Sequence, residues 1–324
     1  MEFRSRLIGV GSYLPEKVLT NDDLPAILET SHEWIMERTG IAQRHIAATN
    51  ELTSDLGYQA ALKALEYASI SPQSIDLIIV ATSTPDRTFP STAIEIQSKL
   101  GIYNGFAFDL QAVCSGFLYA LITADNYIKS GSVKRVLIIG AEIFSRIVDW
   151  NDRSTCILFG DGAGAVIMQA EHKLNLPNES GILASKLCSD GRYADLLYTD
   201  GGPAMSEKVG KIHMQGREVF KHAVEKMSSV SAEVLNQSGY NIDDISKIIP
   251  HQANTRILQS VSKKLNCPYS KIMSTIDKHA NTSAASIPLA LDYGIRTEQI
   301  NSQDLILLMA LGAGFTWGSA IVRL

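Results

Sequence analysis

The amino-acid sequence predicts an α/β fold made of two similar halves. Short apolar runs, of the kind that form strands covered on both faces, alternate with segments of helical periodicity along the 324 residues. Three blocks recur in the same order after a shift of 170 residues, namely 77–79, 119–121 and 136–139 over 247–249, 289–291 and 306–309. A polar stretch with Pro and Gly at 171–181 marks the join, so we expect the halves to be residues 1–173 and 174–324.

The individual elements follow from local periodicity. Residues 53–68 carry apolar side chains at helical spacing behind a Thr or Ser cap, and residues 115–128 form a second predicted helix. Strands are expected at 77–81, 136–140, 157–159, 166–168 and 305–309. Residues 305–322 contain no charged residue, but the Gly-Ala-Gly at 312–314 divides them, so we expect strand, turn and strand in a protein core rather than a membrane span.

Composition excludes several classes of protein. A hydrophobic fraction of 45% with 19% charged residues excludes a disordered chain, and the net charge of −5 argues against a dedicated nucleic-acid binder. The four cysteines form no CxxC pair and no Cys/His cluster, so we expect neither a disulfide framework nor a metal site, and reduced thiols suit the cytoplasm. The apolar run near the N-terminus is too short for a signal peptide, and no membrane association is expected.

Cys114 is the candidate nucleophile. It follows an apolar segment and precedes the helix predicted at 115–128. The free N–H groups and the positive dipole end of a helix N-terminus lower the pKa of a thiol, and the same N–H groups can bind an oxyanion. The alternative is a buried thiol that only fills space, which is the commonest role of a free cysteine and the one we assign to Cys156, Cys188 and Cys267.

His251 and Asn281 are weaker candidates when each is taken alone. His251 stands where the apolar run 247–250 ends, and ligand sites gather at strand ends in α/β sheets, although a structural histidine is an equal alternative. Asn281 precedes a small-residue helix start, where an N-cap is the alternative role. A Cys with a His and an Asn elsewhere in the chain is a known nucleophile pattern, which cysteine proteases share.

A glycine-rich segment at 160–164 (GDGAG) resembles a dinucleotide-binding loop only superficially. Apolar, strand-like runs flank it on both sides and no helix is predicted after it, so a phosphate would find no helix N-terminus there. We therefore expect a tight turn in a β-hairpin.

Four separated motifs occur along the chain, namely AVCSGF (112–117), PHQAN (250–254), HANTSA (279–284) and GAGFTWG (312–318). In this order they closely resemble the β-ketoacyl-acyl-carrier-protein synthase III family, which starts type II fatty-acid synthesis, and the resemblance runs over essentially the whole chain. It implies the thiolase fold, an α/β architecture in which duplicated halves form a five-layered αβαβα sandwich, and a homodimer. It also implies that Cys114, His251 and Asn281 form the catalytic triad, because Asn at the third position matches the priming enzymes.

The resemblance implies a specific mechanism. Cys114 would attack the thioester of acetyl-CoA, or of another short acyl-CoA, with the backbone N–H groups of Cys114 and Ala313 as oxyanion hole. Malonyl-acyl-carrier protein would then enter, and neutral His251 and Asn281 would donate hydrogen bonds to its thioester oxygen as CO₂ leaves. The products would be 3-oxoacyl-acyl-carrier protein, CoA and CO₂. Because the CoA thioester is a substrate, no cofactor is expected.

The resemblance assigns CoA contacts to Thr30, Trp34, Arg38, Arg153 and Asn254. Trp34 and Arg153 would hold the adenine ring, because aromatic and guanidinium planes stack, with Thr30 beside them, Arg38 at the phosphates and Asn254 at the pantetheine arm. A core position for Trp34 and a surface charge for Arg153 are the alternatives. The family commonly has Asn where this chain has Arg217, so the role of that residue is open.

Two further groups of residues concern the partners. Acyl carrier proteins are acidic, and the resemblance points to a basic patch of Lys221, Arg256, Lys263 and Lys264, for which a solvated helix face is the alternative. Phe89 matches the bulky residue that closes the acyl pocket in relatives that prefer acetyl groups. An acetyl or propionyl primer is therefore expected, with branched or longer chains left open.

Two other functions remain as alternatives. One is a related condensing enzyme of secondary metabolism, such as a chalcone-synthase-like enzyme, which also uses Cys, His and Asn. The other is a catalytically silent module that binds acyl-CoA or carrier protein. The intact set of Cys114, His251 and Asn281 disfavours the silent module, because a binding module has no need of a nucleophile.

Overall fold

The protein is described by a computed structural model that covers residues 2–174, 179–206 and 208–324. Its strands are β1 (Phe3–Tyr13), β2 (Lys17–Thr20), β3 (Gln43–Ile46), β4 (Leu77–Ala81), β5 (Phe106–Leu110), β6 (Arg135–Ile143), β7 (Asp161–His172), β8 (Gly181–Ser189), β9 (Leu197–Thr199), β10 (Ile212–Met214), β11 (Lys247–Pro250), β12 (Leu305–Gly312) and β13 (Thr316–Arg323). Its α-helices are α1 (His32–Thr39), α2 (Thr53–Ala68), α3 (Thr92–Lys99), α4 (Gly116–Lys129), α5 (Arg153–Cys156), α6 (Gly216–Ser238), α7 (Thr255–Lys264), α8 (Ile276–His279) and α9 (Ser286–Arg296).

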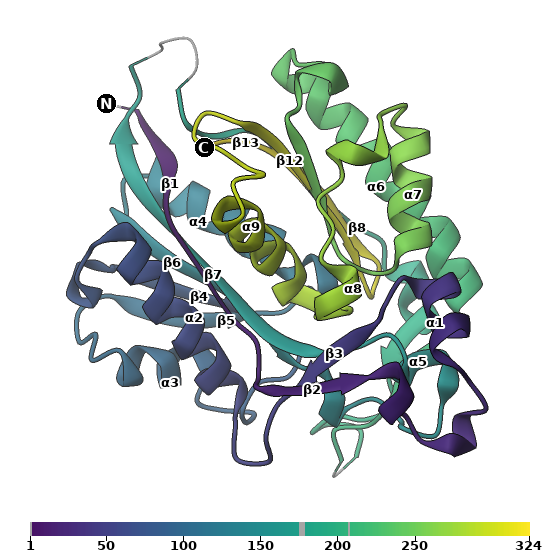
Figure 1. Cartoon of the computed structure of the whole chain (residues 1–324). Coiled ribbons are helices and arrows are strands. Elements are labelled where there is room, and N and C mark those ends of the chain that lie inside the picture. The colour runs from purple at the N-terminus through teal and green to yellow at the C-terminus, as the bar shows by residue number, and fades with distance from the viewer. Residues whose placement is uncertain (1, 175–178, 207) are drawn as a thin grey trace.

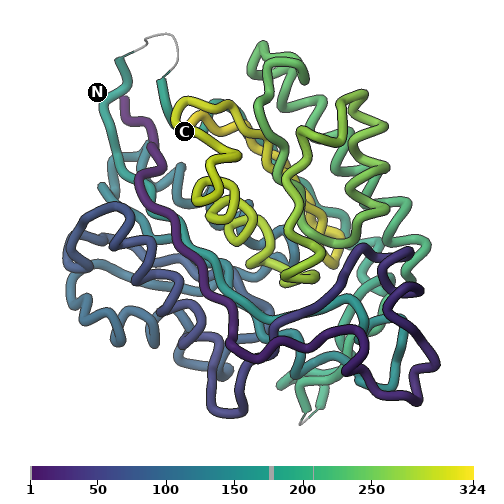
Figure 2. Tube along the Cα trace, in the orientation of Figure 1, coloured from purple at the N-terminus to yellow at the C-terminus, as the bar shows by residue number. Residues whose placement is uncertain are grey.

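These elements stack in five layers (Figure 1). One sheet has the strand order β1-β7-β6-β4-β5, and another has the order β11-β12-β13-β8. Helices α2 and α3 cover the outer face of the first sheet, α4 and α9 lie between the sheets, and α6 and α7 cover the outer face of the second. Figure 2 follows the same path, with the purple strand β1 running beside the teal strand β7. The predicted αβαβα sandwich is confirmed.

The predicted duplication is visible in the strand pairing. Leu77 pairs with Val136 between β4 and β6, and Lys247 pairs with Ile306 between β11 and β12, so both partners move by the same 170 residues. In the first sheet β6 is followed by the antiparallel strand β7 and then by β1. In the second sheet β12 is followed in the same way by the antiparallel strand β13 and then by β8. The strands of the first sheet end at residue 172 and those of the second begin at 181, while residues 175–178 of the expected join lie outside the described residues.

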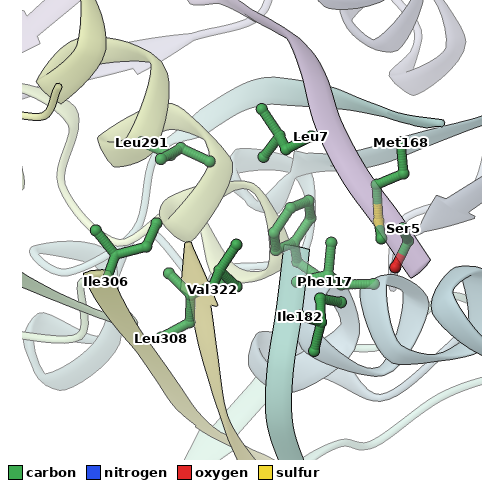
Figure 3. Close-up of a pocket in the computed structure, with 10 residues that line it drawn as sticks. Ser5, Leu7, Phe117, Met168, Ile182, Leu291, Ile306, Leu308 and Val322 are labelled. Carbon is green, nitrogen blue, oxygen red and sulfur yellow. The ribbon is translucent and has the colours of Figure 1, made fainter. Parts of the chain in front are cut away.

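Apolar side chains hold the layers together in separate cores. The largest core fills the central layer and combines residues of both sheets with α4 and α9, while two others fill the space under α2 and α3 and under α6 and α7. Figure 3 shows a small space in the central layer, ringed by Leu7, Phe117, Leu291, Ile306 and other apolar side chains. Its volume is about 10 Å³, the room of one water molecule at most, so it is a packing gap and not a substrate site.

Most predicted elements occur where expected, and two do not. The helix at 53–68 and the strand at 77–81 have the predicted bounds, and residues 305–312 and 316–323 form the predicted strand, turn and strand. Residues 157–159 were expected to form a strand, but only Phe159 makes an isolated bridge, to Asn281. The segment 160–164 is not a hairpin turn, because from Asp161 onward it is the start of β7, paired with both β1 and β6.

Within residues 2–174, 179–206 and 208–324, no helix combines the length and the apolar character needed to cross a membrane.

Candidate active site

Cys114 lies in the sharp turn between β5 and α4. The turn is the 3-10 helix Val113–Ser115, and Val113 has a φ of 48°, a left-handed conformation that is rare for a β-branched residue. The Ser115 hydroxyl holds the turn by donating to the Ala112 carbonyl oxygen at 2.8 Å, and it contacts the hydroxyl of Thr316 at 2.6 Å. The thiol is 5% exposed and sits at the N-terminal end of α4, as the sequence predicts.

The end of β12 packs directly against this turn. A Cβ atom on Gly312 would lie 2.6 Å from the carbonyl oxygen of Ala112 and 2.9 Å from the backbone nitrogen of Cys114, closer than real contacts allow. Glycine at position 312 therefore permits the approach of the two backbones. Ala313 follows at once and lines a cavity together with Cys114.

His251 extends strand β11 by one residue. Its backbone N–H donates to the carbonyl oxygen of Met309 at 2.8 Å, and its side chain is 3% exposed. The Nδ1 atom lies 2.7 Å from the hydroxyl oxygen of Ser286, at the first residue of α9. That oxygen is also 3.4 Å from the backbone nitrogen of Gln252, so Ser286 accepts from Gln252 and can direct its own proton to Nδ1. In this arrangement Nδ1 accepts the Ser286 hydrogen bond, so the single ring proton of the neutral imidazole is on Nε2.

Asn281 lies between α8 and the 3-10 helix Ser283–Ala285 and is 6% exposed. Its backbone is fixed by hydrogen bonds with Leu158 and Gly160, at 2.9 and 3.0 Å. Its side-chain oxygen accepts the backbone N–H of Ser283 at 2.9 Å. Because the oxygen is engaged in this way, the NH₂ group is the part of the carboxamide that can donate to a ligand. The N-cap alternative is wrong, because Thr282 is the N-cap of this 3-10 helix and Asn281 instead accepts from the residue two positions on.

The three predicted triad residues line one cavity of about 420 Å³. Residues of α1, α6 and α7 form its mouth, among them Trp34, Arg38, Val219, Phe220, Asn254 and Arg256. A second cavity of about 100 Å³ also reaches Cys114 and is lined by apolar side chains that include Phe144, Ile147, Phe159, Leu197 and Ile212. The fold thus brings Cys114, His251 and Asn281 to one place, with a large cavity and a small apolar one meeting at the thiol.

Burial controls the charge state of the site. It raises the pKa of the Cys114 thiol to about 12, with a further contribution from the nearby Glu142 carboxylate. The sequence predicted the opposite direction from the helix N-terminus, but the loss of hydration in the dry turn outweighs that effect. Burial also lowers the pKa of His251 to about 3, so the imidazole is neutral, as expected. The free protein therefore holds a thiol beside an uncharged imidazole.

Two guanidinium groups lie over the indole ring of Trp34, which lines the large cavity. The guanidinium carbons of Arg38 and Arg153 are 4.3 and 4.8 Å from the centre of the indole ring. Arg153 is also held by the carbonyl oxygen of Glu29, to which its Nη1 donates at 2.9 Å. The hydroxyl of Thr30, the next residue, is buried and has no hydrogen-bond partner among the described residues. Trp34 thus contacts both Arg38 and Arg153. Thr30 directly follows Glu29, whose carbonyl oxygen binds Arg153.

The comparisons with known proteins agree with this geometry. The family model described as 3-oxoacyl-[acyl-carrier-protein (ACP)] synthase III matches residues 108–191, and the model of its C-terminal part matches residues 235–324. The β-ketoacyl-[acyl-carrier-protein] synthase III of Paramagnetospirillum magneticum is 56% identical over 324 residues, with 100% of both chains covered. The chain belongs to the β-ketoacyl-acyl-carrier-protein synthase III family.

Solved structures give the same result. The crystal structure of 3-oxoacyl-[acyl-carrier-protein] synthase III from Aquifex aeolicus has a TM-score of 0.93 and 48% identity, and the match covers 99% of this chain and 100% of that one. A priming β-ketosynthase from the R1128 polyketide pathway has a TM-score of 0.92 at 32% identity, covering 100% of this chain and 97% of that one. The synthase III assignment confirms the predicted thiolase fold and enzyme class, a condensing acyltransferase of fatty-acid biosynthesis.

Of the remaining predicted residues, two line the large cavity and the others are not among its lining residues. Asn254 lines it, although its side-chain oxygen is engaged in capping α7 by accepting the Ile257 N–H at 3.1 Å. Arg256 lines it too, with its guanidinium 3.9 Å from a carboxylate oxygen of Glu37. Lys264 pairs with Glu225 of α6, while Lys221, Lys263 and Arg217 are exposed on α6 and α7.

Phe89 is the exception among the predicted site residues. Its side chain is 80% exposed, in the segment between β4 and α3, and it is not among the described residues that line either cavity. Within a single chain the fold therefore does not bring Phe89 to the acyl pocket. Among the residues that the structure describes, no group of three His, Cys, Asp or Glu side chains is placed to hold a metal ion.

Sequence reasoning missed three polar residues around the triad. Ser286 fixes the His251 ring, Ser283 contacts Asn281 through its backbone, and Glu142 is buried behind Ser283. Ser283 and Ser286 sit among small residues and carry no distinctive signal. Glu142 does have a signal, because it is a single acidic residue within the apolar run of β6, and a lone buried acid usually has a purpose.

Proposed function

We propose that the chain joins a short acyl group from acyl-CoA, acetyl in the first place, to malonyl-acyl-carrier protein with loss of CO₂. The products are 3-oxoacyl-acyl-carrier protein and CoA, and the reaction primes type II fatty-acid synthesis. One observation carries the proposal: a buried thiol, an uncharged imidazole and an oriented carboxamide line the same cavity. The CoA thioester is a substrate, and the reaction needs no cofactor.

The first half-reaction transfers the acyl group to Cys114. Sulfur attacks the thioester carbonyl carbon, and the backbone N–H groups of Cys114 and Ala313 stabilise the oxyanion. The close approach of Gly312 to the Cys114 turn supports this pairing, since it brings the next backbone unit, that of Ala313, to the small cavity. CoA then leaves through the large cavity.

The second half-reaction uses His251 and Asn281. The malonyl thioester oxygen accepts hydrogen bonds from His251 Nε2 and from the Asn281 NH₂ group, and these bonds stabilise the enolate that forms as CO₂ departs. The Ser286 contact with Nδ1 and the Ser283 contact with the Asn281 oxygen support these donor assignments. The enolate carbon attacks the acyl-Cys114 carbonyl, and the cysteine sulfur is released.

CoA binds at the mouth of the large cavity. The adenine ring stacks on Trp34 with Arg153 on its other side, while Arg38 meets the phosphates and Asn254 the pantetheine arm. An adenine ring between Trp34 and Arg153 makes two stacked contacts. These need about 7 Å between the indole plane and the guanidinium plane, roughly twice an ordinary van der Waals separation. Arg153 therefore has to move outward from its 4.8 Å position over Trp34 and release Glu29 when CoA binds. Thr30, whose hydroxyl is buried and unpaired in the described structure, is next to this movement and contacts the adenine.

The carrier protein docks beside the same mouth. Lys221, Arg256, Lys263 and Lys264 form a basic patch on α6 and α7 that attracts its acidic surface. Arg256 supports this location because it lines the cavity through which the pantetheine arm must pass. Arg217, exposed in the first turn of α6, adds one more positive charge beside the patch.

The small apolar cavity receives the acyl group. Its volume of about 100 Å³ suits an acetyl or propionyl chain beyond the thiol. Phe89 can close this pocket only if a second copy of the chain supplies it, because it is exposed in its own chain. We accordingly propose a cytoplasmic homodimer whose chains each consist of the halves 1–173 and 174–324, and which acts on neither membrane nor nucleic acid.

Mass spectrometry of the intact protein tests the proposal. The protein is exposed to acetyl-, propionyl-, butyryl- and isobutyryl-CoA, with and without prior iodoacetamide. We expect one acyl group on Cys114, most rapidly from the two shorter thioesters, and none after alkylation. Cys156→Ala, which removes another buried thiol, should still be acylated, and Cys114→Ala should not. An acyl group on another residue, or none on the wild type, would refute the proposal.

A further inference from the structure

Glu142 is a fully buried acid that the reaction described above does not use. It is 0% exposed in the middle of the molecule, near the end of β6. One carboxylate oxygen accepts hydrogen bonds from the backbone N–H of Ser83 and the hydroxyl of Thr84, at 3.0 and 2.7 Å, and a longer one from Thr82. Such donors compensate the cost of burying the charged carboxylate.

The other carboxylate oxygen of Glu142 leads to the nucleophile. It accepts the Ser283 hydroxyl at 3.1 Å, and the same Ser283 side chain lies close enough to the Cys114 sulfur to lower the pKa of the thiol, against the larger effect of burial. Ser283 is 0% exposed, and its backbone N–H is bound to Asn281. The buried Ser283 side chain therefore interacts with both Cys114 and Glu142.

The internal duplication explains how this contact arises. Val113, with a φ of 48°, and Ser283, with a φ of 50°, stand 170 residues apart at the same place in the two halves. The turns that begin with these residues meet between the sheets, and a Cβ on Gly116 would lie 3.6 Å from that of Ala284. One turn presents the thiol, and the other presents a hydroxyl to that thiol.

Among the described residues, Cys114 is one ionisable group near Glu142, and the Glu142 carboxylate raises the pKa of its thiol. His251, which lines a cavity with Cys114, is neutral. Asp161 of β7 lies opposite Ile143, the next residue, and its carboxylate is bound by Ser145 and by the Ala47 N–H. Burial raises the pKa of Glu142 to about 7, against the effect of its hydrogen-bond donors, so this carboxyl can gain and lose a proton near neutral pH.

Acylation of Cys114 needs a place for the thiol proton. The thiol is protonated in the free protein, and the buried imidazole of His251 is a poor base. We propose that Glu142 stores the Cys114 proton between the two half-reactions, with the Ser283 hydroxyl as the link. This inference rests on the proposed function and adds a proton acceptor, acting through Ser283, to it.

The steps balance. In acylation the Cys114 sulfur forms a bond to the acyl carbon, the thiol proton passes to the Ser283 oxygen, and the Ser283 proton passes to Glu142. The bond between the acyl carbon and the CoA sulfur breaks, and the CoA thiolate takes a proton from water. In condensation the enolate displaces the Cys114 thiolate, and Glu142 returns its proton through Ser283. Over the cycle one solvent proton is consumed, the one now on CoA.

The number of protons exchanged with the solvent during the acylation step, measured separately from condensation, distinguishes this relay from its alternatives. If the thiol proton left the protein with CoA or entered the solvent, acetyl transfer would exchange no net proton with the medium. If Glu142 keeps that proton, each acetylated site takes up one proton from the solvent. Stopped-flow mixing with acetyl-CoA and a pH indicator, at about pH 7.5, where CoA is a thiol and Glu142 is mostly ionised, measures the difference. Because an acid with a pKa of about 7 is already protonated in a minority of molecules at this pH, we expect transient uptake of less than one proton per acetylated Cys114, in step with acetylation.

Variants locate the stored proton. Glu142→Gln keeps the shape and a hydrogen-bond acceptor but cannot take a proton, and Ser283→Ala breaks the link. Both should lose the uptake and acetylate about 10- to 100-fold more slowly, in the range of a general-base contribution. Malonyl decarboxylation should change far less in both. Ser5→Ala is the matched control, because Ser5 is another buried serine that donates to a buried acid, Asp125, away from the cavity, and it should keep full uptake.

Each outcome of these experiments supports or overturns the proton relay. Acetylation of the wild type without proton uptake would overturn the relay and leave the proposed function intact. Uptake that persists in Glu142→Gln or Ser283→Ala would also overturn the relay. A merely structural role of Glu142 would slow both half-reactions alike without changing the proton count of those sites that still react. Failure of the wild type to become acetylated would overturn the proposed function and the relay with it.

Discussion

Replacing Asn281 by Ala should separate the two half-reactions. The carboxamide donates one of the two hydrogen bonds proposed for the malonyl thioester oxygen, while the Cys114 oxyanion uses backbone groups. Asn281 is only 6% exposed, so a water molecule is poorly placed to substitute for the lost donor. Removal of one such donor raises the barrier by about 3–4 kcal/mol, which slows decarboxylation by about 10²–10³. Acetyl transfer to Cys114 should stay within about threefold of the wild type, since it loses no oxyanion donor.

A second variant, Asn281→Asp, separates the loss of the hydrogen-bond donor from a loss of stability. Asn281→Ala also leaves the buried Ser283 N–H without its acceptor, a loss of about 1–3 kcal/mol in stability. Asn281→Asp keeps an oxygen for that N–H but has no NH₂ donor, so it should lose decarboxylation with less loss of stability. The assay follows release of labelled CO₂ from carboxyl-labelled malonyl-carrier protein beside attachment of labelled acetyl to Cys114. If the two rates fell together in both variants, the division of roles between Asn281 and the backbone groups would be refuted.

Four further outcomes are expected. Trp34→Ala should weaken acyl-CoA binding about tenfold, because it removes a stacked aromatic face, and calorimetric titration measures this. Arg256→Glu should weaken carrier-protein binding and flatten its salt dependence with CoA affinity unchanged, and unchanged carrier binding would count against the basic patch. Gly312→Ala should lower the melting temperature, because its Cβ meets the Ala112 carbonyl oxygen at 2.6 Å and overpacking costs about 1–3 kcal/mol. Since burial lowers the pKa of His251 to about 3, the decarboxylation rate should stay flat as pH falls from about 8 to about 5, whereas an ordinary imidazole would titrate near 6.5.

Apolar periodicity predicted the fold well where burial is uniform. Strand β4 reads LIIVA and is buried at every position, so its bounds followed from its composition. Helix α2 followed from its apolar spacing, although its N-cap is Leu52 and not the predicted Thr53 or Ser54. Residues 157–159 were misjudged because their apolar side chains pack in small clusters outside the two large sheets, Ile157 with Ile35 of α1 and Phe159 with Phe144. The segment 160–164 was misjudged because small residues serve both tight turns and strands packed closely against a helix. There a Cβ on Gly164 would meet Leu289 of α9 at 2.7 Å.

The candidate site was predictable in its identities but not in its energetics. Motifs identified Cys114, His251 and Asn281, and the fold brings them to one cavity. The direction of the Cys114 pKa could not be predicted, because the helix N-terminus is a local feature and burial depends on the whole tertiary structure. The interaction of Ser283 with Cys114 could not be predicted either, since it joins turns that lie far apart in sequence. Phe89 shows the same limit, because the sequence match did not predict that its side chain is exposed in this chain.

The two halves share one central core, and this has a consequence for the whole molecule. Residues on both sides of the join pack into the same apolar cluster, and the thiol is held by backbone from one half and backbone from the other. A clamshell motion between the halves would separate Cys114 from His251 and Asn281, so the proposed entry of CoA requires the movement of single side chains such as Arg153. Cutting the gene near codon 174 should accordingly give two inert fragments, and any activity regained on mixing them would report how faithfully they reassemble.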